Sequence, residues 1–332
     1  MPNGFHHHRT ENTEVAQRVG KRNGGVTQLS HETLSSLLSR FADVDSLSDQ
    51  DTRRLIELSQ ADPVELALVS RSRYSLESSI ARRLQNFATI TASLRERGLK
   101  FEPTALWSHY IPLADLMVTW CSSKRPCLFG IAGSPGVGKT SLTAVLAIAA
   151  EILSESPVAV VSLDDFYLEP SERERLGHKW RAVPGTHDLE LLSDFLQEIG
   201  SQQAEIRIPR YDTRTEKRLP PIPTARPQII FFEGFFVGAA VPGYEMLTKS
   251  LSYLIYLHMD LELAHVCRLD REARIRVESN NTRGMSEHET ECFWQEALLP
   301  TIMEWVTPLE QRADLTLAID GSHRICGVSS RT

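Results

Sequence analysis

Apolar positions in the second half of the chain alternate between two patterns. Short, nearly unbroken apolar runs predict strands of a parallel sheet that is covered on both faces. These runs lie at 127–132, 158–162, 229–232, 253–257 and 315–319, with a weaker one at 206–208. Apolar residues at three- and four-residue spacing predict helices between them, at 140–152, 189–199, 261–277 and 287–306, the last with a break at Pro300. This alternation predicts the α/β class, with a doubly wound parallel sheet.

The first part of the chain has a different pattern. Residues 1–27 are polar and glycine-rich, which predicts a disordered tail. From there to residue 120 apolar residues recur at helical spacing, as in Leu34, Leu37, Leu38 and Phe41. We therefore expect residues 28–120 to form a helical extension that packs on an α/β domain of residues 121–332.

Composition narrows the class of protein. The 332 residues are 41% apolar and 24% charged with a net charge of −7, which argues against a dedicated nucleic-acid binder. The five cysteines lack C-x-x-C spacing, so neither a zinc site nor a disulfide framework is indicated. No apolar run reaches membrane-spanning length and no secretion signal is evident, so we expect a cytoplasmic protein without membrane partners.

The strongest chemical signal follows the first predicted strand. Residues 133–140 match the phosphate-binding pattern G-x-x-x-x-G-K-[ST], between a strand and a helix. In this arrangement backbone N–H groups and a helix N-terminus converge on phosphate oxygens. The expected ATP contacts are Gly133, Ser134, Pro135, Gly136, Val137, Gly138, Lys139, Thr140 and Ser141. We expect Lys139 to reach the β- and γ-phosphates and the Thr140 hydroxyl to bind Mg²⁺.

Carboxylates follow two further strands of the predicted sheet. Asp164 and Asp165 come directly after the run 158–162, and Glu233 follows the run 229–232. Ligands of open α/β sheets bind beyond the carboxyl ends of the strands. One aspartate can accept a proton from an attacking hydroxyl, while the other and Glu233 can hold Mg²⁺. The alternative for the aspartates is an ordinary acidic turn.

Polar residues between these strands are candidates for binding the acceptor. Asp188 can bind a substrate hydroxyl, and it can equally cap the helix 189–199, with His187 beside it as a weaker candidate. In the segment 209–218, Arg210 and Arg218 can clamp an anionic acceptor. A solvated charged loop is the competing interpretation of this segment.

A later helix carries a row of arginines. Arg268, Arg271 and Arg274 are spaced i, i+3 and i+6, roughly on one face. We interpret Arg271 and Arg274 as lid residues that close over the transferring phosphate, against the alternative of an exposed, ion-paired face. Ser286 and Glu289 predict a capping box for the following helix.

These motifs together resemble the phosphoribulokinase, uridine kinase and pantothenate kinase group of P-loop kinases. The shared motifs are G-x-x-G-x-G-K-T at 133–140, S-x-D-x-F-Y at 162–167 and Glu233-Gly234. A closer resemblance, to the D-glycerate 3-kinase family, lies in S-L-D-D-F-Y-L (162–168), P-G-T-H-D-L (184–189), P-R-Y-D (209–212), F-E-G-F (232–235) and R-G-M-S (283–286). The resemblance implies that Asp164 is the general base, and it adds Tyr167 and Tyr211 to the candidate acceptor residues.

The resemblance implies an enzyme that uses ATP and Mg²⁺ to phosphorylate a small-molecule hydroxyl, and most closely D-glycerate to 3-phosphoglycerate. Uridine or pantothenate as the acceptor is the alternative within the group. A regulatory P-loop NTPase is disfavoured because the chain lacks an N-K-x-D segment. One departure concerns the acceptor: the family continues its Tyr-Asp segment into a longer glycine-containing stretch, whereas Tyr211-Asp212 runs directly to Arg218 and a proline-rich segment. The oligomeric state is not predicted.

Overall fold

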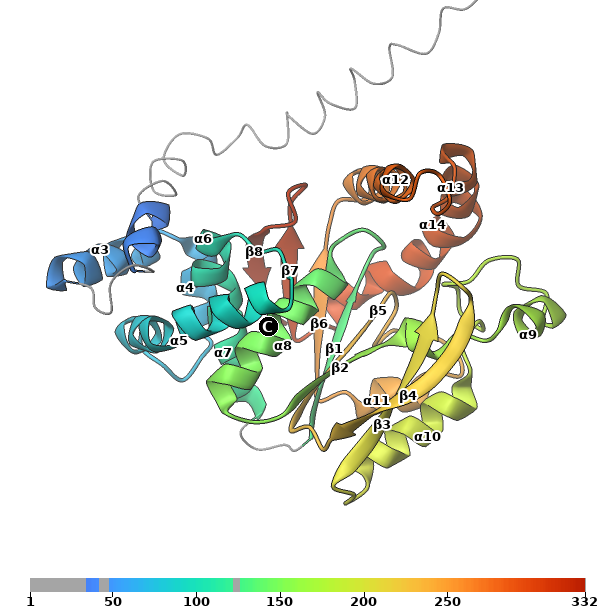
Figure 1. The fold of residues 1–332 in the computed structure, drawn as a ribbon, viewed down its shortest axis with the longest axis horizontal. Helices are drawn as coiled ribbons and strands as arrows, with labels where there is room; N and C mark the ends of the chain where they lie inside the picture. The colour runs from blue at the N-terminus through green and yellow to red at the C-terminus, as the bar shows by residue number, and fades with distance from the viewer. Residues whose placement is uncertain (1–33, 42–47, 122–125, 332) are drawn as a thin grey trace, which may run out of the picture.

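A six-stranded sheet forms the centre of the molecule, with strand order β2-β5-β1-β6-β7-β8 (Figure 1). The structure, a computed structural model, describes residues 34–41, 48–121 and 126–331, so the predicted tail lies outside it. The strands are β1 (Cys127–Gly133), β2 (Val158–Ser162), β5 (Ile229–Gly234), β6 (Tyr253–His258), β7 (Leu315–Ile319) and β8 (Ile325–Ser329). The first five are parallel and β8 runs antiparallel to β7, which confirms the predicted parallel α/β fold and adds an unpredicted edge strand.

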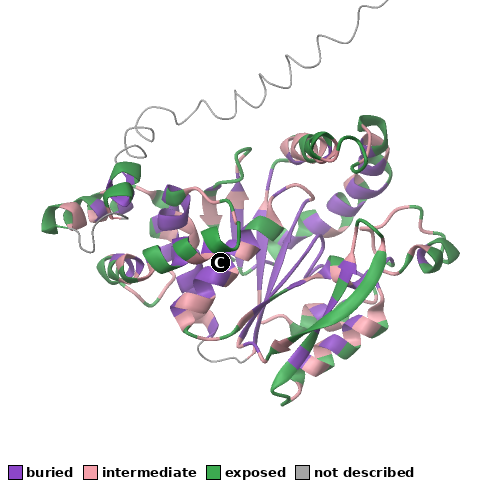
Figure 2. Ribbon diagram, viewed as in Figure 1, coloured by how far each residue is buried: buried purple, intermediate pink, exposed green. Residues whose placement is uncertain are grey.

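The weak strand prediction at 206–208 was wrong in length and in placement. Those residues belong to β3 (Glu205–Asp212), which pairs with β4 (Lys217–Ala225) as an antiparallel hairpin outside the central sheet. β4 contains three prolines and is almost entirely exposed, as Figure 2 shows. Proline lacks an N–H donor, so such a strand is compatible only with an edge position, and within the described residues β4 pairs with β3 alone.

Helices cover the sheet and extend from it. Those that follow the first strand are α8 (Lys139–Ser154), α9 (Pro170–Arg175), α10 (Leu189–Gly200), α11 (Glu245–Ser250), α12 (Leu261–Glu278), α13 (Glu287–Phe293) and α14 (Leu299–Thr301). Short 3₁₀ segments lie at Leu163–Phe166 and Thr307–Gln311. The expected break at Pro300 is absent: helical backbone continues from 287 to 306. Two π-helical turns, Trp294–Leu298 and Ile302–Val306, flank the proline and change the hydrogen-bond spacing around its missing N–H.

A layer of helices precedes the central sheet in the chain. It contains α3 (Asp49–Gln60), α4 (Pro63–Val69), α5 (Leu76–Glu96), α6 (Pro103–Ala105), a π-helical turn (Leu106–Tyr110) and α7 (Ile111–Trp120). Figure 1 shows this layer on one side of α8, which α5 and α7 contact, while α4 contacts β8. Inside it, Arg83 and Glu65 form a fully buried ion pair of 2.6 Å, and the Arg83 guanidinium lies over the Trp107 ring.

The strand order explains where a site can form. β2, β5 and β1 are neighbours, so the segments after their carboxyl ends lie side by side. The parallel register pairs Ser162 of β2 with Glu233 of β5, and Gly234 with Ala132 of β1. The phosphate loop, Glu233 and the Asp164 turn therefore meet at one edge of the sheet.

Candidate active site

The phosphate loop connects β1 to α8 in a backbone shape that depends on glycine. Gly136 and Gly138 have φ values of 89° and 94°, in the left-handed region that a Cβ disfavours. A Cβ at Gly136 would also lie 3.3 Å from the backbone of Ala264 and of Arg268 on α12. The close approach of α12 thus leaves no room for a side chain at Gly136.

Lys139, the first residue of α8, reaches back across this loop. Its Nζ donates hydrogen bonds to the carbonyl oxygens of Gly133 and Ser134, at 2.7 and 3.1 Å. Burial lowers the pKa of Lys139 to about 8, with the carboxylates of Glu233 and Asp164 opposing that shift. The ammonium group therefore lies between the loop and both strand-end acids, where a bound phosphate would meet it.

The next residue, Thr140, contacts the acid at the end of β5. The Thr140 hydroxyl donates to Glu233 Oε1 at 3.2 Å, and Glu233 is buried. Burial raises the pKa of Glu233, against the effect of Lys139. A hydroxyl beside a carboxylate is a donor set that fits Mg²⁺, which completes its coordination with water and phosphate oxygens. Among the described residues no group of three or more His, Cys, Asp or Glu side chains is arranged for a metal.

The adjacent acids Asp164 and Asp165 have different surroundings. Asp164 is exposed, and its charge acts on Lys139, Glu233 and the buried Tyr167. The carboxylate of Asp165 instead accepts a hydrogen bond from the Tyr211 backbone N–H at 3.0 Å and pairs with Arg210 at 3.4 Å. Asp164 therefore faces the phosphate side, whereas Asp165 is engaged with β3.

Three aromatic side chains form a buried cluster that includes Tyr167, the residue after the Asp164 turn. The rings of Tyr167 and His187 are stacked at 4.6 Å, and His187 Nδ1 lies 2.8 Å from the Tyr244 hydroxyl. The other ring nitrogen, Nε2, is buried without a hydrogen-bond partner among the residues that the structure describes. Burial lowers the pKa of His187 to about 3, so this imidazole is neutral at physiological pH.

Asp188 carries out the capping role predicted as one alternative. One carboxylate oxygen accepts from the Leu191 backbone N–H at 2.9 Å, at the start of α10. The second oxygen pairs with Arg218 of β4 at 2.8 Å. Tyr211 is buried, and its hydroxyl donates to the Leu168 carbonyl at 3.4 Å. These candidate residues thus join the hairpin to the Asp164 turn and to α10.

Arginines of α12 lie over the phosphate side. Arg271 and Arg274 are exposed, and the charge of Arg271 acts on Lys139. Arg268 also acts on Lys139, pairs with Glu272 at 2.9 Å and is largely buried. The structure therefore brings Arg268 and Arg271 toward the phosphate loop, while Arg274 lies further along the helix.

The sequence interpretation missed three residues that lie against this site. Arg173 and Arg181 both pair with Glu216 at the end of the hairpin turn. His323, in the turn between β7 and β8, lies with Nε2 2.8 Å from the Gly136 carbonyl oxygen. No motif contains these residues, and only the short run K-W-R before P-G-T-H-D could have drawn attention to Arg181.

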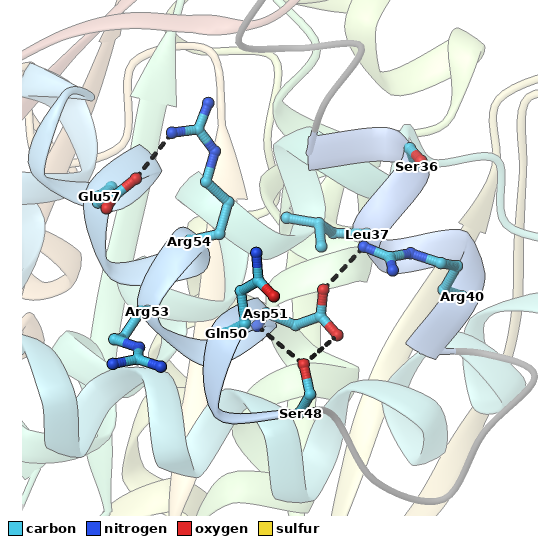
Figure 3. A pocket seen from close by; sticks show the side chains of 9 residues that line it. All are labelled: Ser36, Leu37, Arg40, Ser48, Gln50, Asp51, Arg53, Arg54 and Glu57. Carbon is cyan, nitrogen blue, oxygen red and sulfur yellow. Dashed lines mark hydrogen bonds and ion pairs between the residues drawn. The ribbon is translucent and has the colours of Figure 1, made fainter.

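A cavity of about 750 Å³ lies elsewhere, among the N-terminal helices (Figure 3). Its charged lining is already paired: Arg40 with Asp51 at 2.8 Å, and Arg54 with Glu57 at 2.7 Å. Figure 1 places these helices well apart from the strand ends that carry the phosphate loop. We therefore do not assign this cavity to the site. In the described part of the chain, no helix has the length and apolar character needed to cross a bilayer.

Several known kinases are similar to this chain in fold or in sequence. The structure of D-glycerate 3-kinase from Cryptococcus neoformans matches 73% of this chain and 99% of its own, with a TM-score of 0.57 and 18% identity, which concerns the fold alone. The pantothenate kinase of Mesorhizobium japonicum is 27% identical over 312 residues, covering 86% of this chain and 90% of that one. The pantothenate kinase of Xanthobacter autotrophicus is 29% identical over 234 residues, covering 63% and 71%. The model of the phosphoribulokinase / uridine kinase family matches residues 128–323, more than half of the chain, and the protein therefore belongs to this family of P-loop kinases.

Proposed function

We propose that this protein transfers the γ-phosphoryl group of ATP to the hydroxyl of a small hydroxy acid, with the 3-hydroxyl of D-glycerate as the first candidate. One observation carries the proposal. The exposed carboxylate of Asp164 lies at a strand end within electrostatic reach of Lys139, next to the Thr140–Glu233 pair. In this proposal Asp164 is the base for the acceptor hydroxyl, and it lies next to the residues that would hold the phosphates and Mg²⁺.

On the nucleotide side, the backbone of residues 133–141 and the Lys139 ammonium hold the phosphates. Lys139 exchanges its bonds to the Gly133 and Ser134 carbonyls for phosphate oxygens. Thr140 and Glu233 hold Mg²⁺, which when bound neutralises charge on the β- and γ-phosphates. Asp165 was expected to assist the metal, but its bonds to Tyr211 and Arg210 favour a role in fixing β3 instead.

On the acceptor side, Asp164 accepts the proton of the attacking hydroxyl. A positioned base of this kind typically contributes about 10²–10⁴ in rate. Arg268 and Arg271 of α12 lie on the side of Lys139 and stabilise the transferring phosphoryl group. Arg274 remains a candidate for the same lid when α12 moves.

The charge around the acceptor side favours an acid over a nucleoside. Arg210 and Arg218 border this region, and both already pair with carboxylates of the protein. The aromatic rings of Tyr167 and His187 are buried against each other, so little ring surface is free to stack on a base. Asp188 and His187 stay candidates for the acceptor hydroxyls. Both Asp188 oxygens are engaged within the protein and His187 Nε2 is buried, so either residue would have to move or change partners to bind them.

Pantothenate is the second candidate acceptor. It too combines a carboxylate with a hydroxyl, and the curated relatives that align over 312 residues are named pantothenate kinases. The two acids differ in length, so a direct comparison of kcat/KM decides between them.

An ADP-release assay tests the function. D-glycerate, pantothenate, uridine and ribulose 5-phosphate are each offered with Mg·ATP, and Lys139→Ala prepared in parallel measures contaminating ATPase. We expect D-glycerate to give the highest kcat/KM, and glyceramide, which lacks the charge, to be poor. Preference for uridine, or equal use of glycerate and glyceramide, would refute the acid assignment.

We also propose that residues 28–120 are a helical extension of a kinase domain formed by residues 121–332. The contacts of α5 and α7 with α8 support a firm attachment. The extension would then stabilise the helix that begins at Lys139.

A further inference from the structure

Arg173 of α9 and Arg181 of the loop that follows it share a single carboxylate of the hairpin. Arg173 Nη2 lies 3.1 Å from Glu216 Oε2, and Arg181 Nη1 lies 2.8 Å from Glu216 Oε1. Arg181 Nη1 also donates to the Thr213 carbonyl at 2.7 Å. We call the two guanidinium groups and their common partner the Glu216 clamp.

The clamp has more donors than Glu216 can satisfy. Arg173 is 8% exposed, and its Nε and Nη1 are buried without an acceptor among the residues described. Buried guanidinium donors without acceptors are unfavourable, and two positive charges here face one negative charge. A second carboxylate, or a better-placed one, would satisfy these donors.

The position of the clamp connects it to the proposed chemistry. Both arginines act electrostatically on Tyr211, and Arg181 also acts on Tyr167 and Arg268. Tyr167 is in turn within electrostatic reach of Asp164. The clamp is bonded to the hairpin that carries Tyr211, and the Tyr211 ring contacts the Tyr167 ring at 5.7 Å, three residues beyond Asp164 in the chain. We therefore place the clamp on the acceptor side.

The residue in the clamp is held in an unfavourable backbone conformation. Glu216 has a φ of 53°, in the left-handed region, although it carries a Cβ. The following residues form β4, which is exposed along its length. Glu216 itself is half-buried, just before this exposed strand, so an external carboxylate can reach and compete for its two ion pairs.

We infer that Arg173 and Arg181 are the residues that bind the carboxylate of the acceptor, and that Glu216 occupies their site until the acceptor displaces it. This inference rests on the proposed function. It assigns binding of the acceptor's carboxylate to the clamp arginines in place of Arg210 and Arg218. Bidentate guanidinium–carboxylate bonds supply both affinity and orientation for a small acid. Glu216 then acts as an internal competitor for this site.

The direction in which one substitution changes the KM for D-glycerate tests the inference. Glu216→Gln keeps the shape and removes the competing charge, so we expect the KM for D-glycerate to fall by about three- to tenfold. Arg181→Gln should raise that KM by about ten- to a hundredfold, the loss expected for a charge-assisted hydrogen bond, while the KM for ATP changes little. The matched control is Glu57→Gln, which breaks the Arg54–Glu57 pair on α3 and should change neither constant. Thermal unfolding of each variant establishes that it is folded.

A purely structural clamp predicts the opposite sign, because loosening the arginines would raise the KM for D-glycerate in Glu216→Gln. That result, or an unchanged KM in Arg181→Gln, would overturn the inference. Calorimetric binding of D-glycerate to Glu216→Gln and to the native protein provides a readout that needs no turnover. If the native protein neither binds nor phosphorylates any hydroxy acid, the proposed function itself fails, which is a separate outcome.

Discussion

The nucleotide side and the acceptor side of this site are constructed differently. On the nucleotide side, one continuous segment and the end of β5 supply the proposed contacts with the β- and γ-phosphates and Mg²⁺. Among the described residues, Lys139 hydrogen-bonds to carbonyl oxygens of its own loop. On the acceptor side, residues far apart in the chain are paired with one another, as in Asp165–Tyr211 and Asp188–Arg218.

The difference shows that a P-loop kinase recognises the phosphates and the acceptor with different parts of its structure. Phosphates are common to all substrates of the fold, so a local backbone shape serves to bind them. An acceptor is particular to each enzyme and requires side chains brought together by the whole fold. Changes to the residues that bind phosphate or act as the base should therefore stop catalysis, while changes to the paired residues around the acceptor should alter affinity or stability.

Lys139→Ala should have the largest effect. Removing a cation that stabilises a transferring phosphoryl group costs about 10³–10⁵ in kcat, and the fold should remain intact because the bonds of Lys139 are confined to the loop. Single-turnover kinetics and circular dichroism measure the two properties. Lys249→Ala, at the exposed end of α11, is the control and should retain full activity. Near-native turnover of Lys139→Ala would contradict the kinase mechanism.

The neighbouring acids provide the sharpest comparison between the two sides. Asp164→Asn should reduce kcat by about 10²–10⁴ while Mg·ATP still binds, since the base acts only on the acceptor. Asp165→Asn should lower kcat less than about tenfold and raise the acceptor KM, because its amide oxygen can still accept from Tyr211 while the pairing with Arg210 is lost. Steady-state kinetics measures kcat and the acceptor KM of both variants, and titration with ATP measures whether each still binds Mg·ATP. If Asp165→Asn is the variant that stops turnover with binding intact, the base is assigned one residue too early.

His187 should make stability depend on pH. Burial lowers its pKa to about 3, against an ordinary value of about 6.5, so below pH 6.5 the unfolded chain binds a proton that the folded chain does not. The free energy of unfolding should therefore fall, by up to about 1.4 kcal/mol per pH unit, as the pH drops from 6.5 towards 3. Urea unfolding at pH 7 and 5.5 measures it. In His187→Phe the free energy of unfolding should depend less on pH than in the native protein. His288→Phe, at an exposed position, should show the native dependence. The same dependence in the native protein and both variants would exclude the effect.

The smallest effect is expected at the helix after the lid. Ser286 accepts from the Glu289 N–H, and the Glu289 side chain bonds back to Ser286, forming the predicted capping box. Ser286→Ala should reduce the free energy of unfolding by about 1 kcal/mol and leave kcat nearly unchanged. Urea denaturation measures it, with Ser193→Ala on α10 as a control outside any cap. A loss of activity without a loss of stability would mean that this helix belongs to the site.

Several parts of the fold followed from local sequence. The run 315–319 coincides with β7, because a strand buried on both faces shows as an unbroken apolar segment. The run 158–162 coincides with β2, although Val160 in the middle of this strand is exposed. Asp188 was recognisable as a cap because capping depends on a few consecutive residues. The resemblance to P-loop kinases, which the family match confirms, likewise rests on contiguous motifs.

Other features have no local signal. The proline-rich residues of β4 could be placed as a strand only once β3 was present to pair with them. Asp164 and Asp165 are adjacent and chemically identical, and only the fold directs one towards Lys139 and the other towards Tyr211.

The sequence by itself determined the parallel α/β sheet, the phosphate loop and the helix caps. The spacing of buried residues and the backbone conformation of a loop or cap each depend on a few consecutive residues. Only the tertiary structure decided which charges meet. The pairing of Arg173 and Arg181 with Glu216, and of Arg83 with Glu65, joins segments that are separate in the chain. The energy of such a pair depends on distance and burial, and both exist only after the chain has folded.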